Sequence, residues 1–176
     1  MRFIFSILLI IGTGIMTIGC EAKESQIPDD FGLSFNWNTG ALPPKYHYAY
    51  GITIGPGTQG EFEYIPGYTS SGESNQWITS FSLSKDALEE LYKYLKNQDI
   101  FRAGWKTEHG LIGGSTTSLI ITAYGKEYQI PSISKLEDAE KILVEEAMDV
   151  IRGYVPESIW EEMNDRQTRY EESYQD

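Results

Sequence analysis

Few side chains in this sequence can act as nucleophiles or as general acids and bases, because its 176 residues include only two histidines and one cysteine. His109 is the more suggestive histidine, since it follows Glu108 and precedes the glycine-rich stretch 110–114. A histidine beside an acid can move protons, so His109 and nearby acidic residues in a 104–115 loop define one hypothesis, a hydrolase. His47 falls on the polar face of an expected strand, where a structural role is favoured. We assign no catalytic residue.

The carboxylates do not form a recognisable catalytic pair. Glycoside hydrolysis needs two carboxylates that face each other across roughly 5–10 Å, whereas adjacent residues on a helix point about 100° apart. Solvated helix surfaces therefore explain the adjacent acids better, at Glu89–Glu90, Glu145–Glu146, Glu161–Glu162 and Glu171–Glu172. Glu61 and Glu63 share a strand face and could bind a cation only weakly. The glycines at 110–114 lack the Lys-Ser/Thr of a phosphate loop, so no metal or cofactor is predicted.

The aromatic residues suggest binding rather than catalysis. The chain has 12 Tyr and 4 Trp, and these side chains are favoured where a surface meets a sugar or a protein partner. Most of them alternate inward along expected strands and belong to the core. Trp37, Tyr68 and Trp105 fall in expected loops, and with His109 they form the predicted binding surface for an envelope protein or a glycan. An inhibitor-like module that inserts loops 66–75 and 104–115 into a partner enzyme is a further hypothesis.

The first twenty residues have the pattern of an export signal. Arg2 supplies a positive start, Phe3 to Ile11 is an apolar run broken only by Ser6, and the segment ends at Gly19-Cys20. The run is too short to span a bilayer, which takes about twenty apolar residues. A small residue directly before a cysteine resembles the lipobox of bacterial lipoproteins.

The resemblance implies how the chain is processed and where it resides. Residues 1–19 would be a signal peptide, and Cys20 would be lipidated and become the N-terminus, anchored in a bacterial membrane. Glu21 is not the Asp of an inner-membrane retention signal, which favours the outer membrane in a two-membrane cell. Because Cys20 is the sole cysteine, its lipidation leaves no thiol for disulfides, nucleophilic catalysis or metal binding.

The charge balance excludes some partners. Asp and Glu number 26 against 14 Lys and Arg, a formal net charge of −12. A protein that binds nucleic acid through phosphates needs a basic surface, so nucleic acid is excluded as a partner. Anionic lipid would not attract this surface either, and membrane attachment must depend on the lipid at Cys20.

Residues 20–44 are expected to be the attachment cysteine and a tether, interrupted by proline and glycine, and residues 45–176 a single domain. Within the tether, 31–38 alternates in hydrophobicity and could add an edge strand. Strands are predicted at 46–54 and 61–65, paired so that Ile52 faces Phe62 and Tyr50 faces Tyr64. Further strands are expected at 76–83 and 100–108 and, with both faces covered, at 116–124, followed by a turn at Gly125-Lys126.

Helical spacing predicts helices at 85–97, capped by Ser84, and at 135–152, begun by a capping box from Ser134 to Glu137. A last helix follows Pro156, and the polar chain beyond Asp165 is expected to fray. The predicted fold is α+β, in the order β-β-β-α-β-β-α-α. Its mostly antiparallel sheet of five or six strands carries the first two helices on one face.

Overall fold

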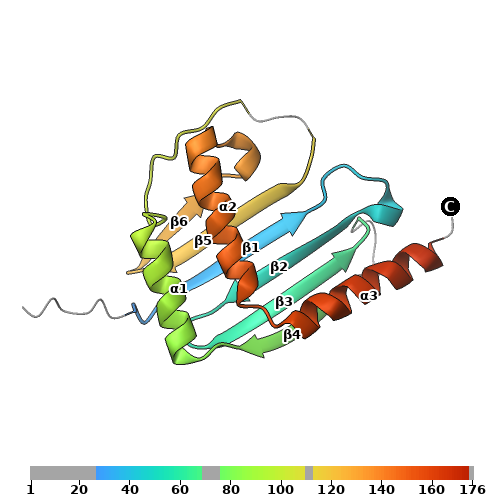
Figure 1. The fold of residues 1–176 in the computed structure, drawn as a ribbon, viewed down its shortest axis with the longest axis horizontal. Coiled ribbons are helices and arrows are strands. Elements are labelled where there is room, and N and C mark those ends of the chain that lie inside the picture. The colour runs from blue at the N-terminus through green and yellow to red at the C-terminus, as the bar shows by residue number, and fades with distance from the viewer. Residues whose placement is uncertain (1–26, 69–75, 110–112, 175–176) are drawn as a thin grey trace, which may run out of the picture.

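The structure is a computed structural model that describes residues 27–68, 76–109 and 113–174. The described residues form a six-stranded antiparallel sheet and three α-helices, which confirms the predicted α+β class (Figure 1). The strands lie in the order β4-β3-β2-β1-β5-β6. Their bounds are β1 Gly32–Asn38, β2 Tyr48–Ile54, β3 Gln59–Pro66, β4 Trp77–Ser82, β5 Thr116–Ala123 and β6 Lys126–Ile130. The helices are α1 Lys85–Asn97, α2 Asp138–Gly153 and α3 Glu157–Ser173.

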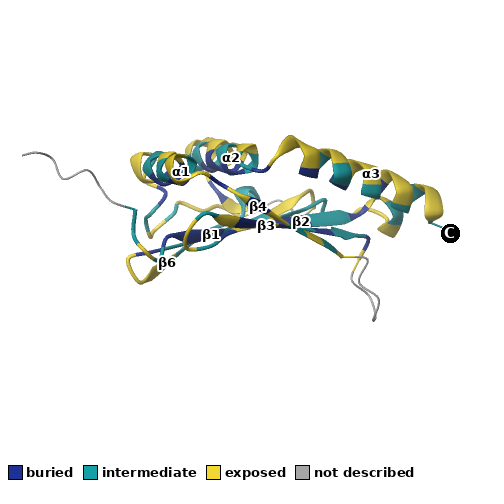
Figure 2. Ribbon diagram, turned by 90° about the horizontal axis from the view of Figure 1, so that it is seen from below, coloured by how far each residue is buried: buried dark blue, intermediate teal, exposed yellow. Residues whose placement is uncertain are grey.

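All three helices lie on one side of the sheet (Figure 2). The side chains of alternate strand residues point toward them, and Phe35, Ile52, Phe62 and Leu119 are almost completely buried there. The predicted register is confirmed, with Ile52 opposite Phe62 and Tyr50 opposite Tyr64. Each helix buries an apolar stripe against this face, as the amphipathic spacing predicts.

Strand β1 lies in the middle of the sheet, a position that its own sequence does not predict. The segment 31–38 was expected to belong to a tether or to form an edge strand, but β1 lies between β2 and β5 in the middle of the sheet. Its inward side chains, Leu33 and Phe35, are nearly inaccessible to solvent, as is Phe31 just before it. The folded domain therefore begins well before residue 45. The surrounding prolines and glycines mark the ends of a strand instead of a linker.

Strand β5 differs from its prediction in a related way. It was expected to be covered on both faces, but the helices of the described residues cover only one, and Ile120 on the other face is half-buried. The turn that follows is Tyr124-Gly125, one residue earlier than predicted, with φ of 57° and 69°. Positive φ at both positions is the mark of a type I′ hairpin turn.

The start of α2 was also predicted wrongly. Ser134 lies in a short 3₁₀ turn, Ile133–Lys135, and the helix begins at Asp138 without a side-chain cap. The reason is a contact distant in sequence: Thr107 forms an isolated β-bridge with Leu136. The N–H of Glu137 donates to Lys106 O at 3.2 Å as part of this contact. The bridge holds Leu136 in an extended conformation (ψ 147°). It is also the only β-pairing of the described residues in 100–108, where a full strand was expected.

Helix α3 continues to Ser173 instead of fraying after Asp165. One polar residue of this helix, Gln167, is buried, with 8% of its surface exposed. The hydroxyl of Tyr64 on β3 donates a hydrogen bond to Gln167 Oε1 at 2.5 Å. This bond fixes the distal half of α3 to the sheet. By contrast, the Ser84 cap of α1 is confirmed, since its hydroxyl accepts from Ala87 N at 3.0 Å.

Candidate functional site

A cavity of about 410 Å³ opens between α2 and the sheet where β1 and β5 lie side by side. We call it the α2 cavity. Its floor comes from β1 and β5, one wall from α2, and its rim from the loop before β5. The lining residues are Phe35, Trp37, Gly113, Gly114, Ser115, Thr117, Ile133, Ser134, Lys141, Glu145, Met148, Asp149 and Arg152.

Trp37 lines this cavity, and its indole packs against two tyrosines of β2. The ring of Tyr48 lies 5.3 Å from it, tilted by 45°. One face of the indole stacks on Tyr50, with ring centroids 5.2 Å apart and planes 22° apart. On the opposite side, the cross-strand neighbour of Trp37 is Thr117 of β5. Thr117 is too small to cover an indole, and both residues line the cavity. Trp37 is therefore held from the β2 side by two aromatic rings, and on the β5 side its cross-strand neighbour is a small residue at the cavity wall.

The glycine-rich rim is held in place by the loop that follows β1. Gly40, Gly113 and Gly114 all adopt positive φ. A Cβ atom on Gly40 would lie 1.9 Å from the carbonyl oxygen of Gly114, so the two backbones are in direct contact. Asn38 also donates a hydrogen bond from its amide to the Thr116 hydroxyl. The glycine-rich stretch that lacks the phosphate-loop pattern is, in its described part, the rim of the α2 cavity.

Helix α2 supplies the charged groups of the cavity. Arg152 pairs with Asp149 and donates a hydrogen bond to the Tyr50 hydroxyl; burial raises the pKa of Tyr50, and this bond opposes that shift. Lys141 and Glu145, one helical turn apart, have no side-chain partner among the described residues. The cavity thus combines an aromatic face with a free ammonium and a free carboxylate.

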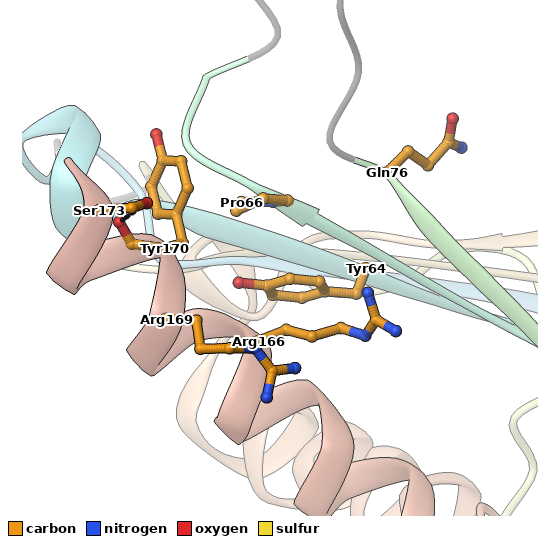
Figure 3. A pocket seen from close by; sticks show the side chains of 7 residues that line it. All are labelled: Tyr64, Pro66, Gln76, Arg166, Arg169, Tyr170 and Ser173. Atoms are coloured by element: carbon orange, nitrogen blue, oxygen red, sulfur yellow. Dashed lines mark hydrogen bonds between the residues drawn. The ribbon is translucent and has the colours of Figure 1, made fainter.

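A second cavity, of about 500 Å³, lies between α3 and the ends of β3 and β4 (Figure 3). It is lined by Tyr64, Pro66, Gln76, Arg166, Arg169, Tyr170 and Ser173. Figure 3 shows Arg166 and Tyr64 close together, with Gln76 across the opening at the start of β4. This cavity is more open to solvent than the α2 cavity.

The polar groups of this second cavity mostly bind side chains that do not line it. Arg166 and Arg169 both contact the single carboxylate of Glu162, at 2.8 and 3.2 Å. Arg166 also lies 4.6 Å above the ring of Trp77. The two ion pairs lie within α3, whereas the contact of Arg166 with Trp77 joins α3 to β4. Because these side chains already bind neighbouring groups, we interpret the second cavity as structural.

The four residues of the predicted binding surface do not converge. Trp37 lines the α2 cavity, whereas Tyr68 stacks on His47 with ring centroids 3.9 Å apart. Trp105 is half-buried beneath the Arg102 guanidinium, 4.2 Å from its ring centroid. His109 is exposed and lines neither the α2 cavity nor the second cavity. Cys20 lies outside the described residues, as does most of loop 66–75.

His47 is more buried than its predicted place on a polar strand face implies, with 8% of its surface exposed. Its Nδ1 lies 2.8 Å from the carbonyl oxygen of Gly40 and 3.0 Å from the Thr39 hydroxyl. The backbone of His47 is also bonded, since Gly67 N donates to His47 O at 2.7 Å. His47 is thus structural, as favoured, and it supports the Gly40 loop that holds the cavity rim.

Sequence reasoning missed Lys141, Glu145 and Thr117 as cavity residues. Glu145 was interpreted as part of a solvated helix surface; it is exposed, as is its neighbour Glu146, but Glu145 also lines the α2 cavity. The available signal was the spacing of Lys141, Glu145 and Asp149, which places them on one face of a helix. Their proximity to Trp37 depends on how α2 crosses the sheet, and no local sequence pattern predicts that crossing.

Comparison with known proteins gives no family for this chain. No protein-family model matches it, and no curated protein matches it. Among the helices in the described ranges, none has the length and apolar character needed to cross a membrane. No group of three or more His, Cys, Asp or Glu side chains that could hold a metal ion occurs within those same ranges.

Proposed function

We propose that this protein is a lipid-anchored protein of the bacterial cell envelope whose domain is a non-enzymatic binding module. Residues 1–19 direct export, and Cys20 carries the lipid. The sequence ending at Gly19-Cys20 supports the anchor. The α2 cavity supports the binding role, and it is the observation that carries the proposal.

The short distance from the anchor to the domain agrees with this arrangement. Cys20 is separated by residues 21–26 from Ile27, which packs against the core. An extended chain spans at most about 3.6 Å per residue, so this tether reaches roughly 25 Å. The domain therefore stays close to the membrane that holds the lipid. In a two-membrane cell this is the outer membrane, because Glu21 replaces the Asp of a retention signal.

The lining of the α2 cavity supports binding more than catalysis. Glu145 and Asp149 both face it, but they come from successive turns of one helix. Hydrolysis of a glycosidic bond needs carboxylates on opposite sides of that bond, and residues at this spacing approach a ligand from the same side. Asp149 is also engaged by Arg152. Glu145 and Asp149 can orient a ligand, but they lack the geometry to cleave it.

The anchor is tested by expressing the full chain and its Cys20→Ser variant in a bacterial host. We expect the wild type to incorporate labelled fatty acid and to partition into the membrane fraction. Cys20→Ser should incorporate none and keep the mass of the unprocessed precursor. A second variant, Cys20→Ser with Ser25→Cys, restores a thiol a few residues further along the chain and should behave like Cys20→Ser. Equal size and equal membrane partitioning of wild type and Cys20→Ser would refute lipid anchoring.

A further inference from the structure

We propose that the α2 cavity binds a pyranose ring of a saccharide, with one face of the sugar stacked on the indole of Trp37. This inference rests on the proposed function, because it names the ligand of the binding module. It follows from three features of the cavity: a fixed aromatic face, two charged groups without partners among the described residues, and a suitable volume.

The aromatic face comes first. A pyranose carries C–H groups on its flat faces and hydroxyls around its edge. An indole fixed on one side is a suitable platform for such a ring, because tryptophan offers a large apolar area at little cost in conformational entropy. Tyr50 already holds Trp37 in place, so the platform exists before the ligand arrives.

The polar groups then suit the edge of the sugar. The carboxylate of Glu145 can accept hydrogen bonds from hydroxyls, and the ammonium of Lys141 can donate them. Neither has a competing partner among the described residues, and hydrogen bonds to charged groups are the stronger class. The volume of about 410 Å³ lies within the range of roughly 300–1,000 Å³ typical of small-molecule sites.

Other ligand classes fit this lining less well. A wholly apolar ligand would remove water from Lys141 and Glu145 without replacing their hydrogen bonds, which is costly. A polyanion would meet Glu145, Asp149 and a protein of net charge −12. A neutral molecule with an apolar face and a polar edge satisfies all three features, and a saccharide has that chemistry.

The test uses the purified full chain in detergent, titrated with trisaccharides of N-acetylglucosamine, cellotriose and maltotriose. Tryptophan fluorescence and calorimetry measure binding. We expect saturable binding of at least one trisaccharide. Trp37→Phe should abolish most of the fluorescence change and weaken binding about tenfold, since it retains a ring against Tyr50 but offers less area. Glu145→Gln and Lys141→Gln should each weaken binding about tenfold, the loss expected from one charged hydrogen bond.

Glu146→Gln is the matched control. Glu146 is exposed on the same helix but does not line the cavity, so its change should leave affinity unaltered. No saturable binding of any of the three probes would overturn the proposal, and so would binding that Trp37→Phe and Glu145→Gln leave unchanged. The titration needs no lipid, so it can succeed where the Cys20 test fails, or fail where that test succeeds. Release of shorter sugars during the titration would instead refute the non-enzymatic role.

Discussion

Gly40 and Gly114, which are 74 positions apart in the sequence, touch backbone to backbone at the rim of the α2 cavity. A Cβ on Gly40 would lie 1.9 Å from the carbonyl oxygen of Gly114. The loop between β1 and β2 and the loop before β5 can approach this closely only because residue 40 lacks a side chain. The position of the rim therefore depends on a single hydrogen atom in place of a methyl group.

Gly40→Ala should consequently destabilise the protein and displace the rim. Its φ of 77° costs a non-glycine residue roughly 1–2 kcal/mol, and the contact with Gly114 adds to this. Gly104→Ala is the control, because Gly104 has a φ of 80° but a Cβ on it would have nothing within 4 Å. Denaturant unfolding should show a larger loss for Gly40→Ala. Equal losses would mean that the Gly40–Gly114 contact contributes nothing.

Asp30 makes stability depend on pH at the other end of the same strand. Its carboxylate accepts hydrogen bonds from the N–H groups of Gly125 and Tyr124, at 2.5 and 2.9 Å. These bonds, that of Gly125 above all, hold the pKa of Asp30 below its ordinary value. Because the folded-state pKa of Asp30 is lowered, its carboxylate stabilises the protein at pH values above the unfolded-state pKa of about 3.9. That contribution is lost as the pH falls through the folded-state pKa.

Asp30→Asn should remove this part of the acid sensitivity and speed amide hydrogen exchange at Tyr124 and Gly125. Asp29→Asn serves as the control, because Asp29 is exposed and adjacent. The measurement is unfolding midpoint against pH, with exchange followed by NMR. Unchanged exchange at the turn in Asp30→Asn would show that the carboxylate does not order it.

The parts of the fold that could be predicted are those that depend on neighbouring residues. The pairing of Ile52 with Phe62 follows from two alternating strands joined by a short turn, and the Ser84 cap is specified within a few residues. The errors share a different origin. The central place of β1 depends on pairing with β5, which is far along the chain, and the delayed start of α2 depends on Thr107.

The residues of the candidate site likewise divide into those that local sequence predicts and those that depend on long-range packing. Trp37 was selected as an aromatic residue in an expected loop, although it lies in the central strand β1. Thr117 is significant only as the small cross-strand neighbour of Trp37, and this relationship requires the register of β1 against β5. Lys141 and Glu145 become cavity residues only once α2 is placed across those strands.

The buried pair of Tyr64 and Gln167 should be energetically coupled. Tyr64→Phe leaves the Gln167 carbonyl oxygen without its donor, at a cost of about 1–3 kcal/mol. Gln167→Met removes the partner and also the bonds from its amide to Glu171 and to Lys45 O. A double-mutant cycle measured by chemical denaturation should give a coupling of about 1 kcal/mol. Strict additivity of the two single changes would show that this bond does not fix α3 to the sheet.

Alkaline conditions should unfold the protein, because burial raises the pKa of Tyr50, Tyr64 and Tyr92 above the ordinary value. The folded state favours the neutral forms of these tyrosines. Their contribution to stability is therefore complete below the unfolded-state pKa of about 10, and it disappears as the pH rises through their folded-state pKa values. Ultraviolet absorbance of tyrosinate, followed together with circular dichroism, should show part of the 12 tyrosines ionising only as structure is lost. Tyr64→Phe should make stability fall less steeply with pH in this range, whereas the same change at exposed Tyr46 should not. Ionisation of all tyrosines near pH 10 with the dichroism unchanged would contradict the burial of these hydroxyls.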